Sequence, residues 1–269
     1  DLRGKEKYVA LVKKTGFNEE KESALFRDII ENMYYPYDHE RQVFLQQDGY
    51  LDKEQLLVKD LPASERPINQ KWSWDRILRS CFIKQADVLQ GIYFFEDRYD
   101  TDTIRRNFNF YEPRTVHESS LSPCVHAIIA AKLGDGQRAY EFYLRTARLD
   151  LDDYNNDTED GCHITSMAGT WMAIVEGFGG MRVKEGMLSF QPFLPEKWAS
   201  FSFKIGFRDT LLRVTVKRDG LAINHLSGGD TDLLINGHKS TLSHGKAIGV
   251  KTFSVKMAVP FPPPKSDDK

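Results

Sequence analysis

The spacing of hydrophobic positions along the chain changes once, near residue 180. Before that point apolar residues recur every three or four positions, and Leu25, Phe26 and Ile29 share one side of a helix predicted over residues 18–33. After it, apolar and polar residues alternate in short runs separated by turn residues such as Asn236-Gly237. The pattern predicts a mainly α chain with a C-terminal antiparallel β-sheet or sandwich domain.

A cluster of glycines, Gly177, Gly179 and Gly180, follows the last predicted helix and marks the domain boundary. We predict a helical domain over residues 1–180, an antiparallel β domain over 181–258 and a proline-rich, charged tail over 259–269. The expected strands cover residues 187–190, 201–205, 211–217, 221–226 and 233–236.

The charge balance excludes several classes of partner. The 269 residues carry a formal net charge of −2 with both signs interspersed, which gives no electrostatic footprint for nucleic acid or an anionic membrane. No apolar run is long enough to cross a bilayer. Three cysteines without a C-x-x-C pair are typical of reduced thiols in a cytoplasmic protein.

The acidic run over residues 150–160 lacks the spacing of a calcium-binding loop. We interpret it as a solvated connector near the rim of a pocket. The sequence offers no metal-ligand cluster with credible spacing, and we expect no metal and no cofactor.

A polar stretch rich in hydroxyl groups precedes the helix predicted from about Pro123. His117, Ser119 and Ser120 lie in it, and the unpaired N–H groups at a helix start attract anions such as phosphate. The alternative is an ordinary capped helix, with Ser119, Ser120 or Ser122 as the cap, which accounts for every residue except His117 and Glu118.

A second stretch of the same design precedes the helix that contains Trp171. Gly161 and His163 stand among small polar residues immediately before an apolar series. Two histidine-bearing helix starts predict one shared anion pocket.

A third motif, KQADVL over residues 84–89, combines a cation with an amide. Lys84 donates, whereas Gln85 both donates and accepts, which suits neighbouring hydroxyls of a sugar ring. Taken alone, Lys84 is better interpreted as a surface lysine paired with Asp87 at i+3.

Three motifs together resemble the C-terminal third of the glycoside phosphorylases that act on maltose, trehalose and kojibiose. They are KQADVL over residues 84–89, T-V-H-E-S-S-L-S over 115–122 and DGCHITSMAGTW over 160–171. The resemblance extends to about Leu188. It implies part of an (α/α)6 barrel followed by a small β domain, and inverting cleavage of an α-glucosyl disaccharide by inorganic phosphate to β-glucose 1-phosphate. Maltose is the expected substrate, with trehalose and kojibiose left open.

The resemblance also assigns residues. It implies sugar contacts from Lys84 and Gln85, and phosphate contacts from the segments around His117 and His163. We add Glu118 as a candidate contact to the second sugar. Phosphate contacts are thus expected from His117, Ser119, Ser120, Gly161 and His163. It makes Gln46 and Gln47 weaker sugar candidates, for which a solvated loop is the alternative.

One departure from the family pattern is large. The general acid of these enzymes is a glutamate in a motif resembling N-E-Y-E-N-N, which is absent from these residues, so no catalytic residue is assigned here. We expect the chain to be the C-terminal piece of a longer enzyme whose upstream part supplies the acid, and which forms a homodimer. Two alternatives remain: an inverting glucoside hydrolase, and a non-catalytic structural or carbohydrate-binding subunit.

Overall fold

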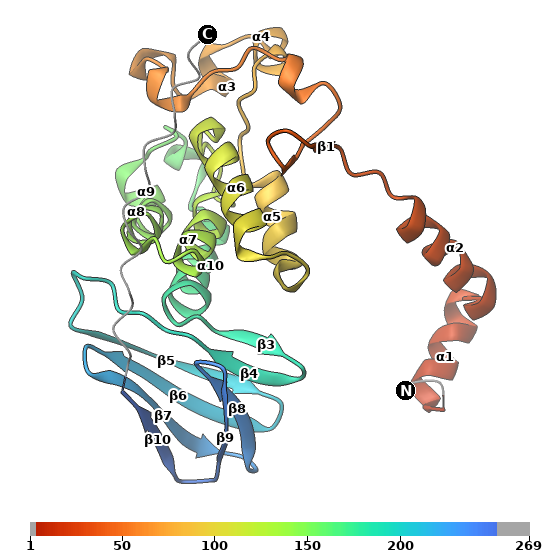
Figure 1. The fold of residues 1–269 in the computed structure, drawn as a ribbon, viewed down its shortest axis with the longest axis vertical. Helices are drawn as coiled ribbons and strands as arrows, with labels where there is room; N and C mark the ends of the chain where they lie inside the picture. The colour runs from red at the N-terminus through yellow and green to blue at the C-terminus, as the bar shows by residue number, and fades with distance from the viewer. Residues whose placement is uncertain (1–3, 252–269) are drawn as a thin grey trace. The chain divides into compact units, whose positions relative to one another are not determined.

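The computed structural model describes residues 4–251. The chain divides into two compact units, of which the first ends at Tyr37 and the second begins at Asp38 (Figure 1). The predicted tail over 259–269, with the last part of the predicted β domain, lies outside the described residues.

The first unit contains two helices, α1 (Glu6–Thr15) and α2 (Glu19–Asn32). Asn18 caps α2 by accepting the Lys21 N–H at 2.9 Å, and Glu22 accepts the Asn18 N–H at 3.0 Å. This reciprocal pair satisfies two of the N–H groups that a helix start leaves unpaired. The helix predicted over residues 18–33 is confirmed.

Short elements precede the main helices of the second unit. They are β1 (Tyr37–Asp38), at the junction of the units, β2 (Val43–Phe44), α3 (Ile68–Lys71), α4 (Trp74–Arg79) and 3₁₀ turns at Tyr50–Asp52, Val58–Asp60 and Ala63–Glu65. Residues 51–70 are mostly irregular, but the end of this segment is not at the surface. Ile68 is buried in a small cluster with Trp72, Phe82 and Val116.

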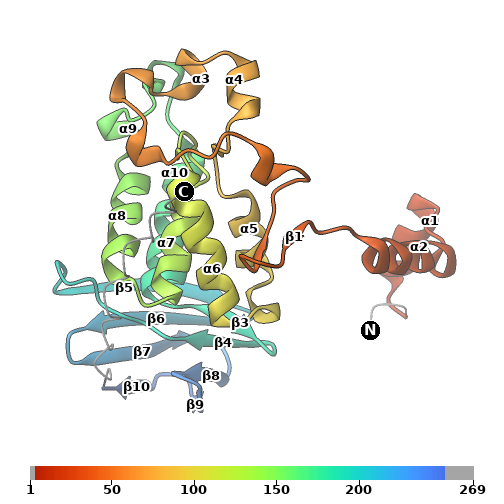
Figure 2. The ribbon, with the colours of Figure 1, turned by 45° about the horizontal axis from the view of Figure 1, so that its top comes forward.

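The main helices follow. They are α5 (Asp87–Phe94), α6 (Thr101–Tyr111), α7 (Pro123–Lys132), α8 (Gly136–Ala147), α9 (Leu149–Asp152), α10 (Ile164–Met172) and a π-helical segment over Ala173–Phe178, with 3₁₀ turns at Glu96–Arg98, Glu112–Arg114 and Thr158–Asp160. Helices α5, α6, α8 and α10 and the π-helical segment pack against α7. Both views place α5 to α8 and α10 on one side of the β-sheets (Figure 1, Figure 2).

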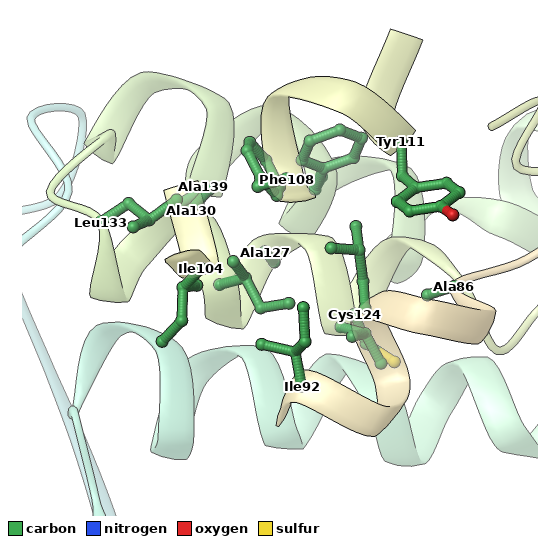
Figure 3. Close-up of a cluster of buried hydrophobic side chains, with 14 of the residues drawn as sticks. Ala86, Ile92, Ile104, Phe108, Tyr111, Cys124, Ala127, Ala130, Leu133 and Ala139 are labelled. Carbon is green, nitrogen blue, oxygen red and sulfur yellow. The ribbon is translucent and has the colours of Figure 1, made fainter. Parts of the chain in front are cut away.

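Helix α7 is buried on all sides because apolar or small residues, together with His126, occupy its whole circumference. Every residue from Pro123 to Ala130 is buried. Figure 3 shows Ala127 and Ala130 of α7 beside Ile104 and Phe108 of α6. A helix that is apolar all round is a core helix, so α7 is the element on which its neighbours are placed.

The C-terminal part consists of two four-stranded sheets with a shared core. One has the order β10-β7-β6-β5 and the other β3-β4-β8-β9. The strands are β3 (Arg182–Lys184), β4 (Met187–Phe190), β5 (Ser200–Phe207), β6 (Thr210–Lys217), β7 (Gly220–Ser227), β8 (Thr231–Ile235), β9 (His238–Leu242) and β10 (Ala247–Val250). In β6, Leu212, Val214 and Val216 alternate with more exposed residues and point into the core.

The predicted fold class, a helical region followed by a β-rich domain, is confirmed, and all five predicted strands are present. One strand pair departs from the predicted antiparallel arrangement, because β4 lies parallel to β8. After β4 the chain builds β5 to β7 in the other sheet and returns to the first sheet as β8. A crossover of this kind allows neighbouring strands to run in the same direction.

An aromatic cluster joins the helices to the β part. Phe178, at the end of the π-helical segment, is fully buried, and its ring centroid lies 5.3 Å from those of Tyr143, Phe193 and Trp198. Arg182 of β3 adds a bidentate ion pair with Glu96, at 2.7 Å and 3.2 Å. The helix that carries one predicted site segment is therefore anchored at its far end.

We expect Phe178→Ala to lower the free energy of unfolding by about 3–5 kcal/mol, because it empties the centre of this aromatic cluster. Denaturant unfolding followed by fluorescence and circular dichroism measures the change. Phe94→Ala is the control, since that side chain is 67% exposed and its loss should cost less than about 1 kcal/mol. Equal losses for the two variants would contradict the assigned role of Phe178.

Candidate active site

The two polar helix starts meet. Ser120 Oγ and Thr165 Oγ1 lie 2.6 Å apart and share a hydrogen bond. This contact places residues 115–120, which precede α7, beside residues 161–166, which lead into α10. The structure thus brings together the two segments that the sequence predicts to form one pocket.

Close packing of α10 on α7 produces this convergence. A Cβ at Gly169 would lie 2.9 Å from Cys124 Cβ, closer than real Cβ contacts come, and 3.0 Å from its sulfur. Ser166, on the same buried side of α10, donates to the Thr146 carbonyl of α8 at 2.7 Å. Small residues on this side let the helix approach its neighbours.

The KQADVL motif joins the site through backbone pairing. The Ile83 N–H donates to the Arg114 carbonyl at 3.1 Å, and the Val116 N–H donates to the Ile83 carbonyl at 3.0 Å. The side chains continue the contact, since Ser119 Oγ donates to Gln85 Oε1 at 3.0 Å. Lys84 is exposed beside them.

The Gln85 side chain belongs to a longer polar row. Its amide also hydrogen-bonds Asp87, whose Oδ2 accepts from Gln46 Nε2 at 2.6 Å. The weaker sugar candidate Gln46 is thereby connected to the motif that contains Lys84 and Gln85.

Serine side chains do not cap α7. Ser122 occupies the N-cap position without a side-chain capping bond, while Ser119 Oγ accepts the Leu121 N–H at 3.2 Å. The hydroxyl of Ser120 instead faces Thr165. The alternative that these serines are ordinary side-chain caps of α7 therefore does not account for them.

His117 lies in the interior, which differs from the expectation that its ring would face an anion. Its Nδ1 is 2.9 Å from Ser122 Oγ, and its ring packs against those of His126 and Phe142, with centroids 4.4 Å and 4.9 Å away. Burial, with a smaller contribution from His126, holds its pKa well below the ordinary value. The imidazole is a neutral core group in this arrangement.

Glu118 also turns inward, which differs from its predicted contact with the second sugar. The residue is 6% exposed. Its carboxylate accepts the Ile68 N–H with both oxygens, at 3.0 Å and 2.9 Å. Arg66 Nε lies 3.7 Å from Oε1. The carboxylate thus holds the start of α3, fifty residues earlier in the chain.

His163 stands at the N-cap of α10 between two carboxylates. Its Nδ1 is 2.6 Å from Asp150 Oδ1, its backbone N–H donates to Asp150 Oδ2 at 2.9 Å, and its Nε2 lies 3.5 Å from Asp157 Oδ2. The hydrogen bond to Asp150 is the main cause that raises the pKa of His163. Gly161, two residues earlier, is exposed and has a positive φ of 124°.

The sequence interpretation missed two members of this cluster. Thr165 is inside the quoted DGCHITSMAGTW motif, but nothing in its spacing signals a contact with Ser120. Asp150 lies in the acidic run that we interpreted as a solvated connector. An acidic run directly before a helix that starts with histidine was the available signal.

Within residues 4–251, no group of three or more His, Cys, Asp or Glu side chains is arranged to hold a metal ion. No helix in that part of the chain is long and apolar enough to cross a membrane.

We expect Asp150→Asn to lower the pKa of His163 toward about 6.5, the ordinary value, because it removes the hydrogen bond that favours the imidazolium. NMR titration of the imidazole C–H resonances measures the pKa of His163 in the unchanged chain and in the variant. In the unchanged chain, the stabilisation from this pair is complete below about pH 6.5 and is lost as the pH rises through the raised pKa of His163. On the acid side it is lost as the pH falls through the lowered pKa of Asp150.

His126 is the internal control for this titration, because burial lowers its pKa to about 4 and Asp150→Asn should leave it unchanged. An identical His163 pKa in both chains would show that Asp150 does not set its charge.

Comparison with known proteins identifies the family of this chain. Residues 5–172 match the glycosyl hydrolase family 65 central catalytic domain, and residues 181–242 match the C-terminal domain of the same family. A maltose phosphorylase of Bacillus subtilis (strain 168) is 60% identical over 198 residues, which are 74% of this chain and 26% of that protein. An alpha,alpha-trehalose phosphorylase of Thermoanaerobacter brockii is 35% identical over 90% of this chain and 31% of its own length.

Among solved structures, a chain from the human microbiome described as a kojibiose phosphorylase superposes with a TM-score of 0.80 at 39% identity, covering 90% of this chain and 33% of that one. This chain therefore spans between a quarter and a third of the length of these relatives. Because the match to the central catalytic domain covers more than half of its residues, the chain belongs to glycosyl hydrolase family 65.

Proposed function

We propose that this chain is part of a disaccharide phosphorylase that cleaves an α-glucosyl disaccharide with inorganic phosphate and inversion, giving β-glucose 1-phosphate and glucose. Maltose is the proposed substrate, since the 60% identical relative is a maltose phosphorylase. The observation that carries the proposal is the contact of Ser120 with Thr165, 2.6 Å apart, beside Lys84 and Gln85.

Phosphate takes the place that water holds in an inverting hydrolase. It is already a competent nucleophile, so the enzyme needs one carboxylic acid to protonate the leaving oxygen and a site that aligns the anion with the anomeric carbon. This chain contributes the site for the anion. We assign phosphate contacts to Ser119, Ser120, Gly161 and His163, near the positive end of the α10 dipole.

His163 supplies the charge for this site. Its bond to Asp150 favours the protonated ring, and a protonated ring donates from both nitrogens. The contact of Nε2 with Asp157 is loose at 3.5 Å. We propose that phosphate replaces Asp157 as the partner of His163 Nε2. Asp150 keeps its hydrogen bond with Nδ1 and so maintains the orientation of the ring.

The glucosyl unit lies against Lys84 and Gln85. Because Ser119 donates to the oxygen of the Gln85 amide, the amide is fixed in one orientation. Lys84 is exposed and free of burial costs. A fixed amide beside a cation discriminates between sugar hydroxyls better than two mobile side chains.

The interior positions of His117 and Glu118 change the part we assign to them. His117 fills the core behind the serines, and Glu118 anchors α3 through the Ile68 N–H. In the proposed enzyme both shape the phosphate and sugar segments from behind.

The upstream part of the enzyme supplies the general acid and covers one side of α10. Ile164, Met167 and Trp171 recur at helical spacing and are 68%, 50% and 45% exposed, whereas Ser166 and Gly169 on the opposite side are buried. An apolar stripe of this kind marks a surface that packs against protein. We infer that the remainder of the catalytic domain occupies it.

In the complete enzyme, we expect His163→Ala to raise the KM for phosphate at least tenfold, because it removes the charged donor. The KM for the disaccharide should change less than threefold. Initial rates of maltose cleavage, measured at varied phosphate and at varied maltose with β-glucose 1-phosphate as the product detected, separate the two constants.

Activity of the unchanged enzyme without phosphate would favour an inverting hydrolase. Failure of the complete enzyme to cleave maltose, trehalose or kojibiose would favour a structural or carbohydrate-binding role. An unchanged phosphate KM in the variant would remove His163 from the phosphate site.

We expect Met167 to be oxidised quickly by hydrogen peroxide in the isolated chain and at least tenfold more slowly in the complete enzyme, because the upstream part covers it. Peptide mass spectrometry over a time course gives both rates. Equal rates would place Met167 on the outer surface of the assembled enzyme and contradict the proposed contact.

A further inference from the structure

The backbone directly before the two site serines is held by arginines. Arg145 of α8 donates from Nη2 to the carbonyls of Val116, at 3.4 Å, and His117, at 3.2 Å. Arg66 donates from Nη2 to the same Val116 carbonyl at 2.6 Å. Two guanidinium groups from distant parts of the chain therefore converge on two consecutive peptide groups.

This backbone has a conformation that needs support. His117 has a positive φ of 56°, in the left-handed region that residues with a Cβ adopt at a cost. Strained residues of this kind persist where their surroundings fix them, and they cluster at functional sites. Here the fixing groups are the carbonyl contacts of the arginines and the packing of the His117 ring.

Placing two arginines together carries its own cost. Burial lowers the pKa of Arg145, and repulsion from Arg66 is the next cause. Glu118 compensates, lying 3.7 Å from Arg66 Nε. Tyr154 adds an aromatic face 5.1 Å from the Arg145 guanidinium. Both arginines are thus confined around the segment they hold.

The segment continues directly into the residues of the site. Ser119 faces Gln85 on the sugar side, and Ser120 faces Thr165 on the phosphate side. One rotation of the peptide after His117 would move both hydroxyls. Fixing the carbonyls of Val116 and His117 therefore fixes the contacts with both substrates.

We propose that Arg145 is a positioning residue, which acts with Arg66 to hold the backbone before Ser119 and Ser120 and so aligns the phosphate and sugar halves of the site. Its assignment to catalysis rests on the proposed function, whereas its effect on the backbone does not. It acts through the peptide groups of Val116 and His117.

The test compares Arg145→Met with Arg138→Met in the complete enzyme. Arg138 is a half-buried arginine on the same helix, and it forms ion pairs with the carboxylates of Glu112 and Asp135. In Arg145→Met we expect the KM values for phosphate and for the disaccharide both to rise about tenfold. Arg138→Met should leave both within twofold of the unchanged enzyme.

A merely structural role would lower the amount of folded enzyme and the apparent kcat without moving either KM. Arg145→Lys keeps the charge but lacks the planar fork, so we expect a rise of about threefold in both constants. Arg145→Lys also replaces Arg145→Met as the test variant if Arg145→Met does not fold. A folded Arg145 variant with both KM values within twofold of the unchanged enzyme would overturn the catalytic part of the proposal.

Hydrogen exchange provides a readout that is independent of the reaction. We expect the amides over residues 117–121 to exchange at least tenfold faster in Arg145→Met than in Arg138→Met, with the protection of α8 retained. Unchanged exchange in this segment would overturn the positioning role. Cleavage without phosphate by the unchanged enzyme would overturn the proposed function alone, since the exchange result still decides what Arg145 does.

Discussion

The close approach of α10 to α7 is the constraint on which the candidate site depends. Gly169 leaves room for Cys124, and α10 therefore lies against a helix that is itself buried on all sides. Because the two helices pack closely, the polar residues that precede them meet, and Ser120 and Thr165 form a hydrogen bond there. A site made from two helix starts has its geometry set by core packing, which is far stiffer than loop structure.

The β part contributes to the same geometry from the other end. The chain passes from α10 through the π-helical segment without a break, and Phe178 then enters the aromatic cluster with Trp198 and Phe193. Tyr93 of α5 donates to Glu176 within the π-helical segment. A helix held at its far end by rings and ion pairs cannot slide along its axis, so its start remains in register with the start of α7.

Much of the fold follows from local rules that the sequence displays. The switch from helical to alternating spacing near residue 180, the glycine cluster and the Asn236-Gly237 turn each predict structure within a few residues of themselves. The convergence of residues 115–120 with 161–166 was also predictable, because both stretches have the composition of a ligand site. The directions of the individual side chains were not.

Direction depends on partners remote in the chain. Glu118 turns inward to the Ile68 N–H, fifty residues away, and His117 turns inward because α7 and α8 present His126 and Phe142. The type of a polar residue does not specify whether its hydrogen-bond partner is solvent, a ligand or a buried amide. The parallel pairing of β4 with β8 is similar, since it follows from a crossover that no local pattern encodes.

The two sides of α10 have different consequences for how its sequence can vary. On the buried side, Gly169 is limited by volume, because one added methyl group would meet Cys124 of the neighbouring helix, and Ser166 is buried and bonded to the Thr146 carbonyl. On the side of Ile164, Met167 and Trp171 the requirement is for apolar area, which several residue types of different shape can provide. Substitutions that adapt one enzyme of this family to a new neighbouring surface can therefore accumulate on one side of a nine-residue helix while the candidate site at its start keeps its form.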